Sequence, residues 1–471
     1  MDAIARYFRF NERRTDLGTE LRAGLTTFMV MAYIIAVNPL ILSIQTEGQG
    51  PPLLQTTVAT ALTAGILCLA MGLVTNYPFA LAAGLGLNAV VAFDLILNRG
   101  FRWEEAMAVI VWEGIIITIL VLTGFRRAIM DAIPLSLKRA IAVGIGLFIL
   151  FIGLVEGGFV QTGAGTPVRL GNVGTLGFVT FAIGLAIALA LMARGIRGAL
   201  LISIIVTTVV AVAFTAIFGV DQVGYAGTAG QLPGQWITPF SGDSFSTLFA
   251  PVGFMFSIFT KPETPMITVI LVIFSLMLSD FFDTMGTVIG VGEEAGLVDE
   301  RGQLPGIDRV LVVDSVGAAL GGLFSTSSNT TYIESAAGVS EGGRTGLTAV
   351  VVGILFLLCI LIAPVVGIIP AQATAPALVV VGYLMFTIAR EIEWTEIDDL
   401  FPALATMIVM PLTYSITNGI AAGFVTFVFL KLVTGRARAV HPLLWVVAIA
   451  FVIYFAIPWL QGVIVPPPPA T

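Results

Sequence analysis

Apolar stretches of roughly twenty residues recur along the chain from Ala23 onward, separated by short polar connections. About 20 consecutive apolar residues are enough for a helix to cross the hydrocarbon core of a bilayer. Charged residues make up only 11% of the chain, whereas soluble domains carry roughly 25%. The sequence therefore predicts an all-α polytopic membrane protein whose main partner is the lipid bilayer.

The apolar stretches form two groups of seven, separated by the more polar segment 220–264. A further apolar stretch, 442–460, precedes the proline-rich end of the chain, and both an additional span and a helix lying at the interface fit it. The expected spans are 23–45, 54–75, 77–97, 106–124, 138–156, 173–193 and 197–219, then 265–289, 307–324, 326–341, 345–366, 371–389, 398–414 and 417–434.

The distribution of basic residues predicts the orientation. Residues 1–22 are polar and lack the apolar region of a cleavable signal peptide. Basic residues cluster in the connections on the N-terminal side, whereas segment 220–264 carries only Lys261. By the positive-inside rule the N-terminus is cytoplasmic and segment 220–264 is extracellular. Seven spans in each half give the halves opposite orientations, as in inverted-repeat transporters.

The third and tenth spans, 77–97 and 326–341, occupy matching places in the two halves and both look interrupted. Each is expected to be a short extended segment followed by a half-helix. The Ser, Thr and Asn run at 325–331 is expected to cap the second half-helix. Interrupted spans at matching positions indicate the binding site of a transporter.

Several carboxylates lie inside the predicted spans. A carboxylate at membrane depth costs about 2.5 kcal/mol or more unless something offsets it, so each one is a candidate functional residue. Glu334 and Asp283 are the leading candidates for substrate binding, and Asp283 shares a helix face with Thr287. Together with Asp280 and Glu113 they are also the candidates for proton coupling. The alternative for Glu334 is a capping or solvated residue at a cytoplasmic helix end, and for Asp280 it is a lining residue nearer the outside. For Asp283 the alternative is a structural hydrogen bond, and for Glu113 and Asp314 it is hydrogen bonding between domains.

Other polar, glycine and aromatic residues complete the predicted substrate site. Asn88 both donates and accepts hydrogen bonds, which suits the edge of a base. Gly84 and Gly86 allow close backbone approach, with helix packing as the alternative. Phe282 is placed to frame a flat ring, as is Phe28. The remaining candidates for substrate contact are Thr27, Thr330 and Thr331.

The same residues argue against other classes of protein. The sequence contains no metal-ligand set, no Ser–His or Cys–His pair and no nucleotide-binding loop, so we expect neither an enzyme nor a cofactor. No basic patch interleaved with aromatic residues indicates nucleic-acid binding. The only histidine, His441, lies outside the predicted core spans, so a carboxylate is the expected proton carrier. Cys68 and Cys359 lie in apolar stretches and are expected to pack as small hydrophobic residues.

Blocks of residues distributed along nearly the whole chain resemble nucleobase–cation symporter family 2, and within it the AzgA-like purine permease branch. The blocks are 22–28, 32–39, 84–89, 280–287, 330–335 and 413–420.

The resemblance implies 14 spans in an inverted repeat of seven plus seven. A core domain would comprise 23–124 and 265–366, and a gate domain 125–219 and 367–434, with 435–471 as a C-terminal extension. It also implies proton-coupled import of adenine, guanine or hypoxanthine across the plasma membrane. By position, the family's substrate acids fall on Asp283 and Glu334, and its asparagine falls on Asn88. A homodimer is compatible with the resemblance.

Two departures separate the chain from the uracil and xanthine branches. Thr287 stands where the uracil branch has a histidine, and Ile333 stands where it commonly has a glycine. The alternatives are a uracil, xanthine or other small-solute transporter of the same fold, or a channel. The residues do not rank the three purines, and they leave sodium open as the coupling ion.

Overall fold

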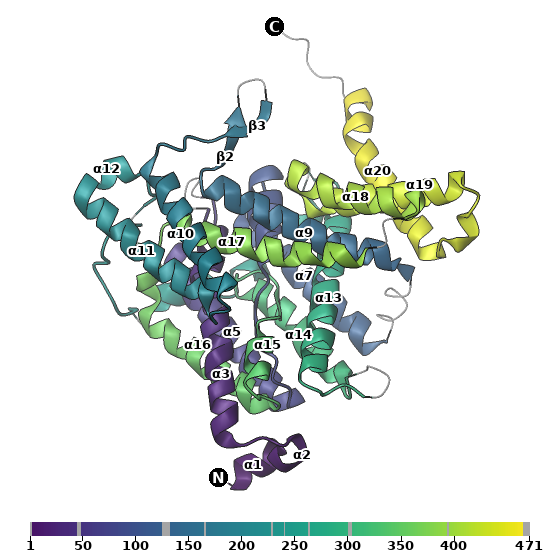
Figure 1. Ribbon diagram of the computed structural model, residues 1–471. Coiled ribbons are helices and arrows are strands. Elements are labelled where there is room, and N and C mark those ends of the chain that lie inside the picture. Colours follow the sequence, from purple (N-terminus) through teal and green to yellow (C-terminus); the bar gives the residue numbers. More distant parts are fainter. Residues whose placement is uncertain are drawn as a thin grey trace.

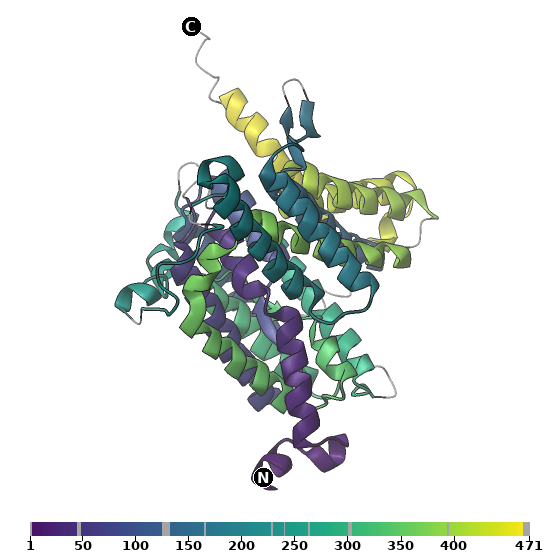
Figure 2. The ribbon, with the colours of Figure 1, turned by 60° about the vertical axis from the view of Figure 1, so that its left-hand side comes forward.

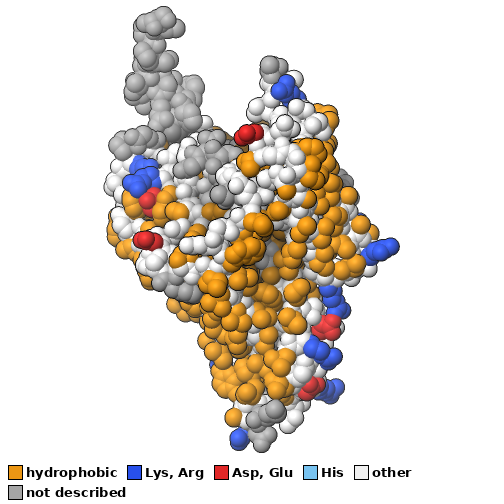
Figure 3. Space-filling model, turned by 90° about the vertical axis from the view of Figure 1, so that its left-hand side faces the viewer, with side chains coloured by type: hydrophobic (Ala, Val, Ile, Leu, Met, Phe, Trp, Pro, Cys, Tyr) orange, Lys and Arg blue, Asp and Glu red, His pale blue; other side chains and the backbone are white. Residues whose placement is uncertain are grey.

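The structure, a computed structural model, describes residues 2–44, 49–124, 132–163, 166–227, 229–239, 241–261, 264–299, 304–392 and 395–464. Within these ranges, ten helices are long and apolar enough to cross a membrane. Hydrophobic side chains cover a broad face of the molecule, and charged side chains gather towards its edges (Figure 3). The chain is therefore a predominantly helical polytopic membrane protein, as the sequence predicts.

One set of helices from both halves of the chain packs together as the core domain. Its helices are α3 (Leu17–Met31), α4 (Ile34–Leu42), α5 (Leu53–Thr75), α7 (Trp103–Leu122), α13 (Met266–Glu294), α14 (Ile307–Leu323) and α16 (Gly346–Cys359), which continues as η5 (Ile360–Ile368). Glycines allow close packing here, because a Cβ atom at Gly114 of α7 would collide with the backbone of Ala319 in α14. At the start of α3, hydrogen bonds from Thr19 hold the pKa of the Asp16 carboxyl below its usual value.

A second set of helices, again drawn from both halves, forms the gate domain (Figures 1 and 2). It consists of α9 (Leu135–Glu156), α10 (Leu176–Ala193), α11 (Ala199–Phe218), α17 (Ala371–Phe386), α18 (Ile397–Thr413) and α19 (Ile416–Val433). A Cβ atom at Gly382 of α17 would collide with the backbone of Gly146 in α9, so this pair of helices also relies on glycine. The limits of the two domains stay predictions.

The connections carry short elements. In segment 220–264 these are α12 (Val220–Val223), η2 (Gly242–Phe245), η3 (Ala250–Phe254) and η4 (Ser257–Phe259). Trp112 of α7 donates to the carbonyl of Met255 at 2.7 Å, which fastens this segment to the core domain. A hairpin of β2 (Val160–Gly163) and β3 (Thr166–Leu170) was not expected from the sequence. Its strands are too short and too exposed to show apolar alternation.

The remaining elements are the N-terminal helices, two short connecting helices and the last long helix. The N-terminal helices α1 (Asp2–Tyr7) and α2 (Phe10–Arg13) define what we call the N-terminal face (Figure 1). Short helices η6 (Thr387–Glu391) and η7 (Ala437–Ala439) flank α18 and α20. Helix α20 (Pro442–Ile464) packs against both α19 and α13, where Phe451 lies 6.2 Å from Phe424 and 6.4 Å from Phe274 between ring centroids. The 442–460 stretch is thus a helix packed against the spanning helices.

Candidate functional site

The two interrupted spans meet at the centre of the core domain. The third span comprises β1 (Leu81–Ala83) and α6 (Leu85–Ala89), and the tenth comprises β4 (Asn329–Thr331) and α15 (Ser335–Ser340). Strands β1 and β4 pair antiparallel, with Leu81 opposite Thr331. The amide of Gly84 donates to the carbonyl of Ser328 at 2.9 Å and extends the ladder. The predicted extended segments are therefore confirmed, and their antiparallel contact fits halves of opposite orientation.

The expectation that the Ser, Thr and Asn run caps the second half-helix was wrong. Glu334 occupies the position before α15 and makes no side-chain cap. The last three residues of the run form β4, and two further residues separate that strand from Glu334. The first part of the run forms a turn, with Ser325 and Ser327 at φ values of 63° and 66°. Asn329 stabilises this turn by donating to Thr326 Oγ1 at 2.9 Å.

Asp314 of α14 anchors β4. Its Oδ1 accepts hydrogen bonds from the amide and the hydroxyl of Thr331, at 2.8 and 2.7 Å. Its Oδ2 accepts from the hydroxyl of Thr284 in α13, at 2.7 Å. The structural alternative for Asp314 is therefore favoured. Thr331, a candidate for substrate contact, is buried with its hydroxyl directed at Asp314.

Glu334 and Asp283, the two leading substrate candidates, flank β4. The hydroxyl of Tyr33 donates to Glu334 Oε1 at 2.7 Å, and the hydroxyl of Thr330 lies 3.4 Å from Asp283 Oδ2. Tyr33 sits in the break between α3 and α4. Tyr33 lies in block 32–39 but is not among the predicted site residues. Its position next to a helix break is the signal that could have identified it.

Asp283 is exposed even though it lies near the middle of the 29-residue helix α13. Gly286 and Gly290 continue the exposed stripe along the helix, and a Cβ atom at either would meet nothing within 4 Å. The stripe leads to the exposed acids Glu293 and Glu294. It therefore marks an aqueous approach to Asp283 rather than a lipid-facing surface.

This approach opens towards the N-terminal face. The guanidinium of Arg13 in α2 lies over the ring of Tyr77, and the Tyr77 hydroxyl donates to the carbonyl of Pro305, shortly after the end of α13. Across the opening, the ammonium of Lys138 in α9 lies 6.0 Å from the ring centroid of Phe282. Phe282 is partly buried and also touches Phe281 edge to face.

At the opposite face, a polar network connects the core and gate domains. Helix α6 continues as the π-helix η1 (Val90–Asn98), in which buried Asp94 pairs with Arg99 at 2.9 Å. Ser415, which caps α19, donates to Asp94 Oδ2 at 2.8 Å. The hydroxyl of Tyr454 in α20 accepts from Arg99 and donates to Asn418, both at 2.8 Å. Ser415 and Asn418 belong to block 413–420, whose role the sequence alone did not reveal.

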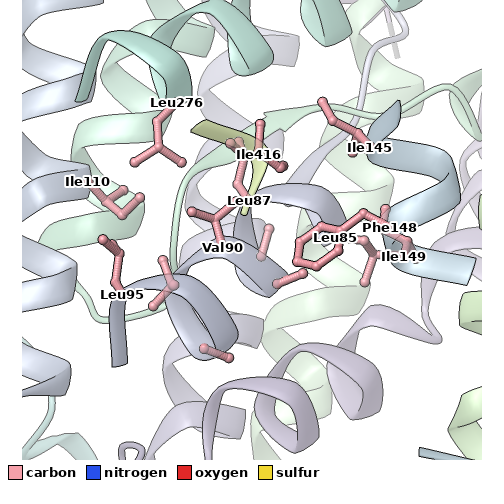
Figure 4. Close-up of a cluster of buried hydrophobic side chains, with 14 of the residues drawn as sticks. Leu85, Leu87, Val90, Leu95, Ile110, Ile145, Phe148, Ile149, Leu276 and Ile416 are labelled. Carbon is pink, nitrogen blue, oxygen red and sulfur yellow. The ribbon is translucent and has the colours of Figure 1, made fainter. Parts of the chain in front are cut away.

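Apolar contacts also join the two domains beside the site. Figure 4 shows Leu85 of α6 near Phe148 and Ile149 of α9, and Leu87 near Ile416 of α19. A Cβ atom at Gly86 would lie 2.5 Å from Ile145 Cγ2, whereas one at Gly84 would meet only ordinary contacts of 3.4 Å or more. Packing therefore explains glycine at position 86, but it does not explain glycine at position 84.

We expect Gly86→Ala to destabilise the protein and Gly84→Ala to leave its stability unchanged. The alanine methyl at position 86 would overpack the contact with Ile145, which costs about 1–3 kcal/mol. Gly84 has a φ of −71°, which alanine adopts without strain. Thermal unfolding of the purified variants measures the difference, and Ile145→Ala should restore the Gly86→Ala variant. Equal stability of both alanine variants would contradict this assignment.

The other predicted residues lie in the same part of the core domain. Asn88 and Thr27 are fully buried, and their side-chain polar atoms have no hydrogen-bond partner within the described ranges. Asp280 is buried in α13, one helical turn from Asp283. Phe28 packs edge-on against Phe356 with ring centroids 5.3 Å apart, which favours its packing alternative.

A family model described as "Permease family" (Xan_ur_permease) matches residues 18–422. Guanine/hypoxanthine permease PbuO of Bacillus subtilis (strain 168) is 39% identical over 455 residues, covering 95% of this chain and 99% of that protein. Adenine permease AdeP of Escherichia coli (strain K12) is 38% identical over 453 residues, covering 96% of this chain and 95% of that protein.

Solved structures with low sequence identity show the same fold. The transmembrane domain of the cyanobacterial bicarbonate transporter BicA matches with a TM-score of 0.61 and 14% identity, covering 86% of this chain and 97% of that chain. The murine anion transporter Slc26a9, in its inward-facing state, matches with a TM-score of 0.59 and 12% identity. The match covers 89% of this chain and 69% of that chain. The chain therefore belongs to the Xan_ur_permease family, nucleobase–cation symporter family 2, and is a multi-pass membrane transporter rather than an enzyme.

Proposed function

We propose that this protein is a secondary-active, proton-coupled importer of the purine nucleobases adenine, guanine and hypoxanthine. The observation that carries the proposal is the convergence of Glu334 and Asp283, from two different spans, on the β1–β4 crossing. Purines present ring N–H groups, which donate strong hydrogen bonds to carboxylates. The names of the relatives, adenine and guanine/hypoxanthine permeases, support the same substrate class.

The surrounding residues suit a flat heterocycle. Asn88 has an amide with both polar atoms unsatisfied among the described residues, and buried polar groups normally have partners. We propose that this amide contacts the purine, as do Thr27 and Thr330. Phe282 provides a partly exposed ring for stacking. The free space at Gly84 lets the base approach the backbone closely.

Transport then proceeds by alternating access of the core domain against the gate domain. The described state has an approach to Asp283 from the N-terminal face and the Asp94–Arg99 network closed at the opposite face. We place the protein in the plasma membrane with its N-terminus in the cytoplasm. In that orientation the described state faces inward. Opening to the outside requires the contacts of Ser415 and Tyr454 with the core domain to separate.

Proton coupling offsets the cost of moving charged carboxylates through a poorly polarisable site. The candidates for the proton carrier are Asp283, Glu334, Asp280 and Glu113. His441 is exposed at the start of α20, away from all of them, and its ring nitrogen accepts from the amide of Leu443 at 3.3 Å. A carboxylate is therefore the proposed carrier.

Cells that lack their own purine uptake provide the test. Expression of the chain should allow accumulation of radiolabelled adenine, guanine or hypoxanthine, and a protonophore should abolish that accumulation. Uracil and xanthine serve as competing substrates in the same assay. Accumulation of uracil or xanthine alone would contradict the proposed substrate class, and purine equilibration without accumulation would indicate a channel instead.

A further inference from the structure

Glu113 is a buried acid for which binding of the purine provides no role. It lies near the middle of α7, and its side chain is fully buried in the core domain. Neither of its carboxylate oxygens has a hydrogen-bond partner within the described ranges, and none of the ion pairs found there includes Glu113. A buried charge without compensation costs far more than a buried neutral group. In this state of the transporter the side chain is therefore held as the neutral acid.

The elements packed around Glu113 supply no positive charge to compensate an ionised carboxylate. The polar groups that interact with it are the hydroxyl of Ser328 and the carboxylate of Asp314 in α14. Helix α13, which also packs on α7, contributes the buried acid Asp280. The close packing of α7 on α14, where a Cβ atom at Gly322 would lie 2.7 Å from the amide of Val111, leaves little space for water to solvate a charge.

Glu113 differs in this respect from the two substrate carboxylates. Glu334 receives a hydrogen bond from Tyr33, and Asp283 is exposed to the aqueous approach. Each of the two therefore has a feature that offsets part of the cost of a charge, a donor for Glu334 and solvent contact for Asp283. Glu113 is fully buried and has no donor at hydrogen-bond geometry among the described residues. The neutral acid has an O–H to offer to the Ser328 hydroxyl, which is itself unsatisfied within the same ranges.

Ser328 connects Glu113 to the substrate site. The carbonyl of Ser328 accepts the amide of Gly84 at 2.9 Å, and Gly84 precedes α6, which carries Asn88. Ser328 also immediately precedes β4. A change in the charge of Glu113 therefore acts on the segment that fixes both interrupted spans relative to each other.

We propose that Glu113 binds the coupling proton, at a site separate from the purine-binding carboxylates Asp283 and Glu334. The inference rests on the proposed function, proton-driven purine transport. The carboxylate takes one proton from water while the carrier faces outward and crosses as the neutral acid, which is its form in the described inward-facing state. It releases the same proton to cytoplasmic water in the following step, before the carrier returns outward. The substrate carboxylates keep their protonation state through the cycle.

The test uses the full-length protein reconstituted in liposomes, with the radiolabelled purine that the wild type accumulates and a pH-sensitive dye inside. Glu113→Gln, which mimics the neutral acid, should retain purine exchange at near the wild-type rate. Its accumulation driven by a proton gradient should fall at least tenfold, and the purine-dependent dye signal should disappear. Glu113→Asp should restore part of the proton-driven accumulation and part of the dye signal. Glu156→Gln, at a half-buried acid of the gate helix α9, is the matched control and should behave as the wild type.

Two results would overturn the inference. One is Glu113→Gln accumulating purine with a full dye signal. The other is a parallel loss of exchange and accumulation that Glu113→Asp does not restore, since Glu113 would then serve binding or folding. Failure of the proposed function is distinguishable, because it appears in the wild type: no purine uptake refutes the substrate class, and uptake without a dye signal refutes proton coupling.

Discussion

Replacing Glu334 by glutamine is expected to weaken purine binding by roughly 100-fold. The carboxylate accepts N–H groups of the base, and hydrogen bonds to charged groups each contribute about 1.5–3 kcal/mol. Glutamine keeps the shape but places an N–H group opposite a donor of the purine. A loss of about 2.8 kcal/mol corresponds to the 100-fold change in Kd. Binding of radiolabelled purine to the purified protein measures it directly.

Two further variants make the prediction specific. Tyr33→Phe removes the donor that orients Glu334, at a hydrogen-bond distance of 2.7 Å, without touching the carboxylate. We expect a smaller effect, about tenfold in Kd, because only one charge-assisted hydrogen bond is lost. Glu12→Gln, at an exposed acid of α2, removes the same charge far from the site and should leave Kd unchanged. If the Glu334→Gln variant binds purine with wild-type affinity, Glu334 does not contact the purine.

Residue patterns in the sequence were sufficient for the long spanning helices and the two interruptions, whereas the count of 14 spans stays a prediction. Apolar length alone placed the expected span 54–75, observed as α5 (Leu53–Thr75), because a bilayer fixes how long such a helix is. The same logic marked Asp283, Asp314 and Glu334 as unusual. The pattern could not tell which acid anchors β4, because that depends on contacts between residues far apart in the chain, such as Thr284 with Asp314.

Local turn chemistry explains most of what the sequence analysis missed. Ser, Thr and Asn favour helix caps and turns for the same reason, since their short side chains bond to nearby backbone groups. The run at 325–331 therefore fitted a cap equally well, until the β1–β4 pairing showed that the strand comes first. The π-helix η1 has no recognisable pattern of its own, because its apolar residues also fit an α-helix.

Removing the Asp314 carboxylate is the second change for which we expect a large effect. In Asp314→Ala three buried donors, the Thr331 amide and the hydroxyls of Thr331 and Thr284, lose their acceptor. Each unsatisfied buried donor costs about 1–3 kcal/mol, so we expect the protein to lose about 3 kcal/mol or more of stability. The loss should appear as a lower unfolding temperature of the detergent-solubilised protein.

Asp314→Asn separates geometry from charge. The amide oxygen can take both hydrogen bonds from Thr331, and the amide nitrogen can donate to the Thr284 hydroxyl, which rotates to accept. We therefore expect the asparagine variant to keep most of the stability and the transport activity that the alanine variant loses. Asp308→Ala, at an exposed acid in the first turn of the same helix, controls for charge on α14. Equal damage from alanine and asparagine would instead mean that the negative charge itself is required. Asp314 would then belong with Asp283 and Glu334 in the electrostatics of the site, rather than serving as the support that holds β4 beneath them.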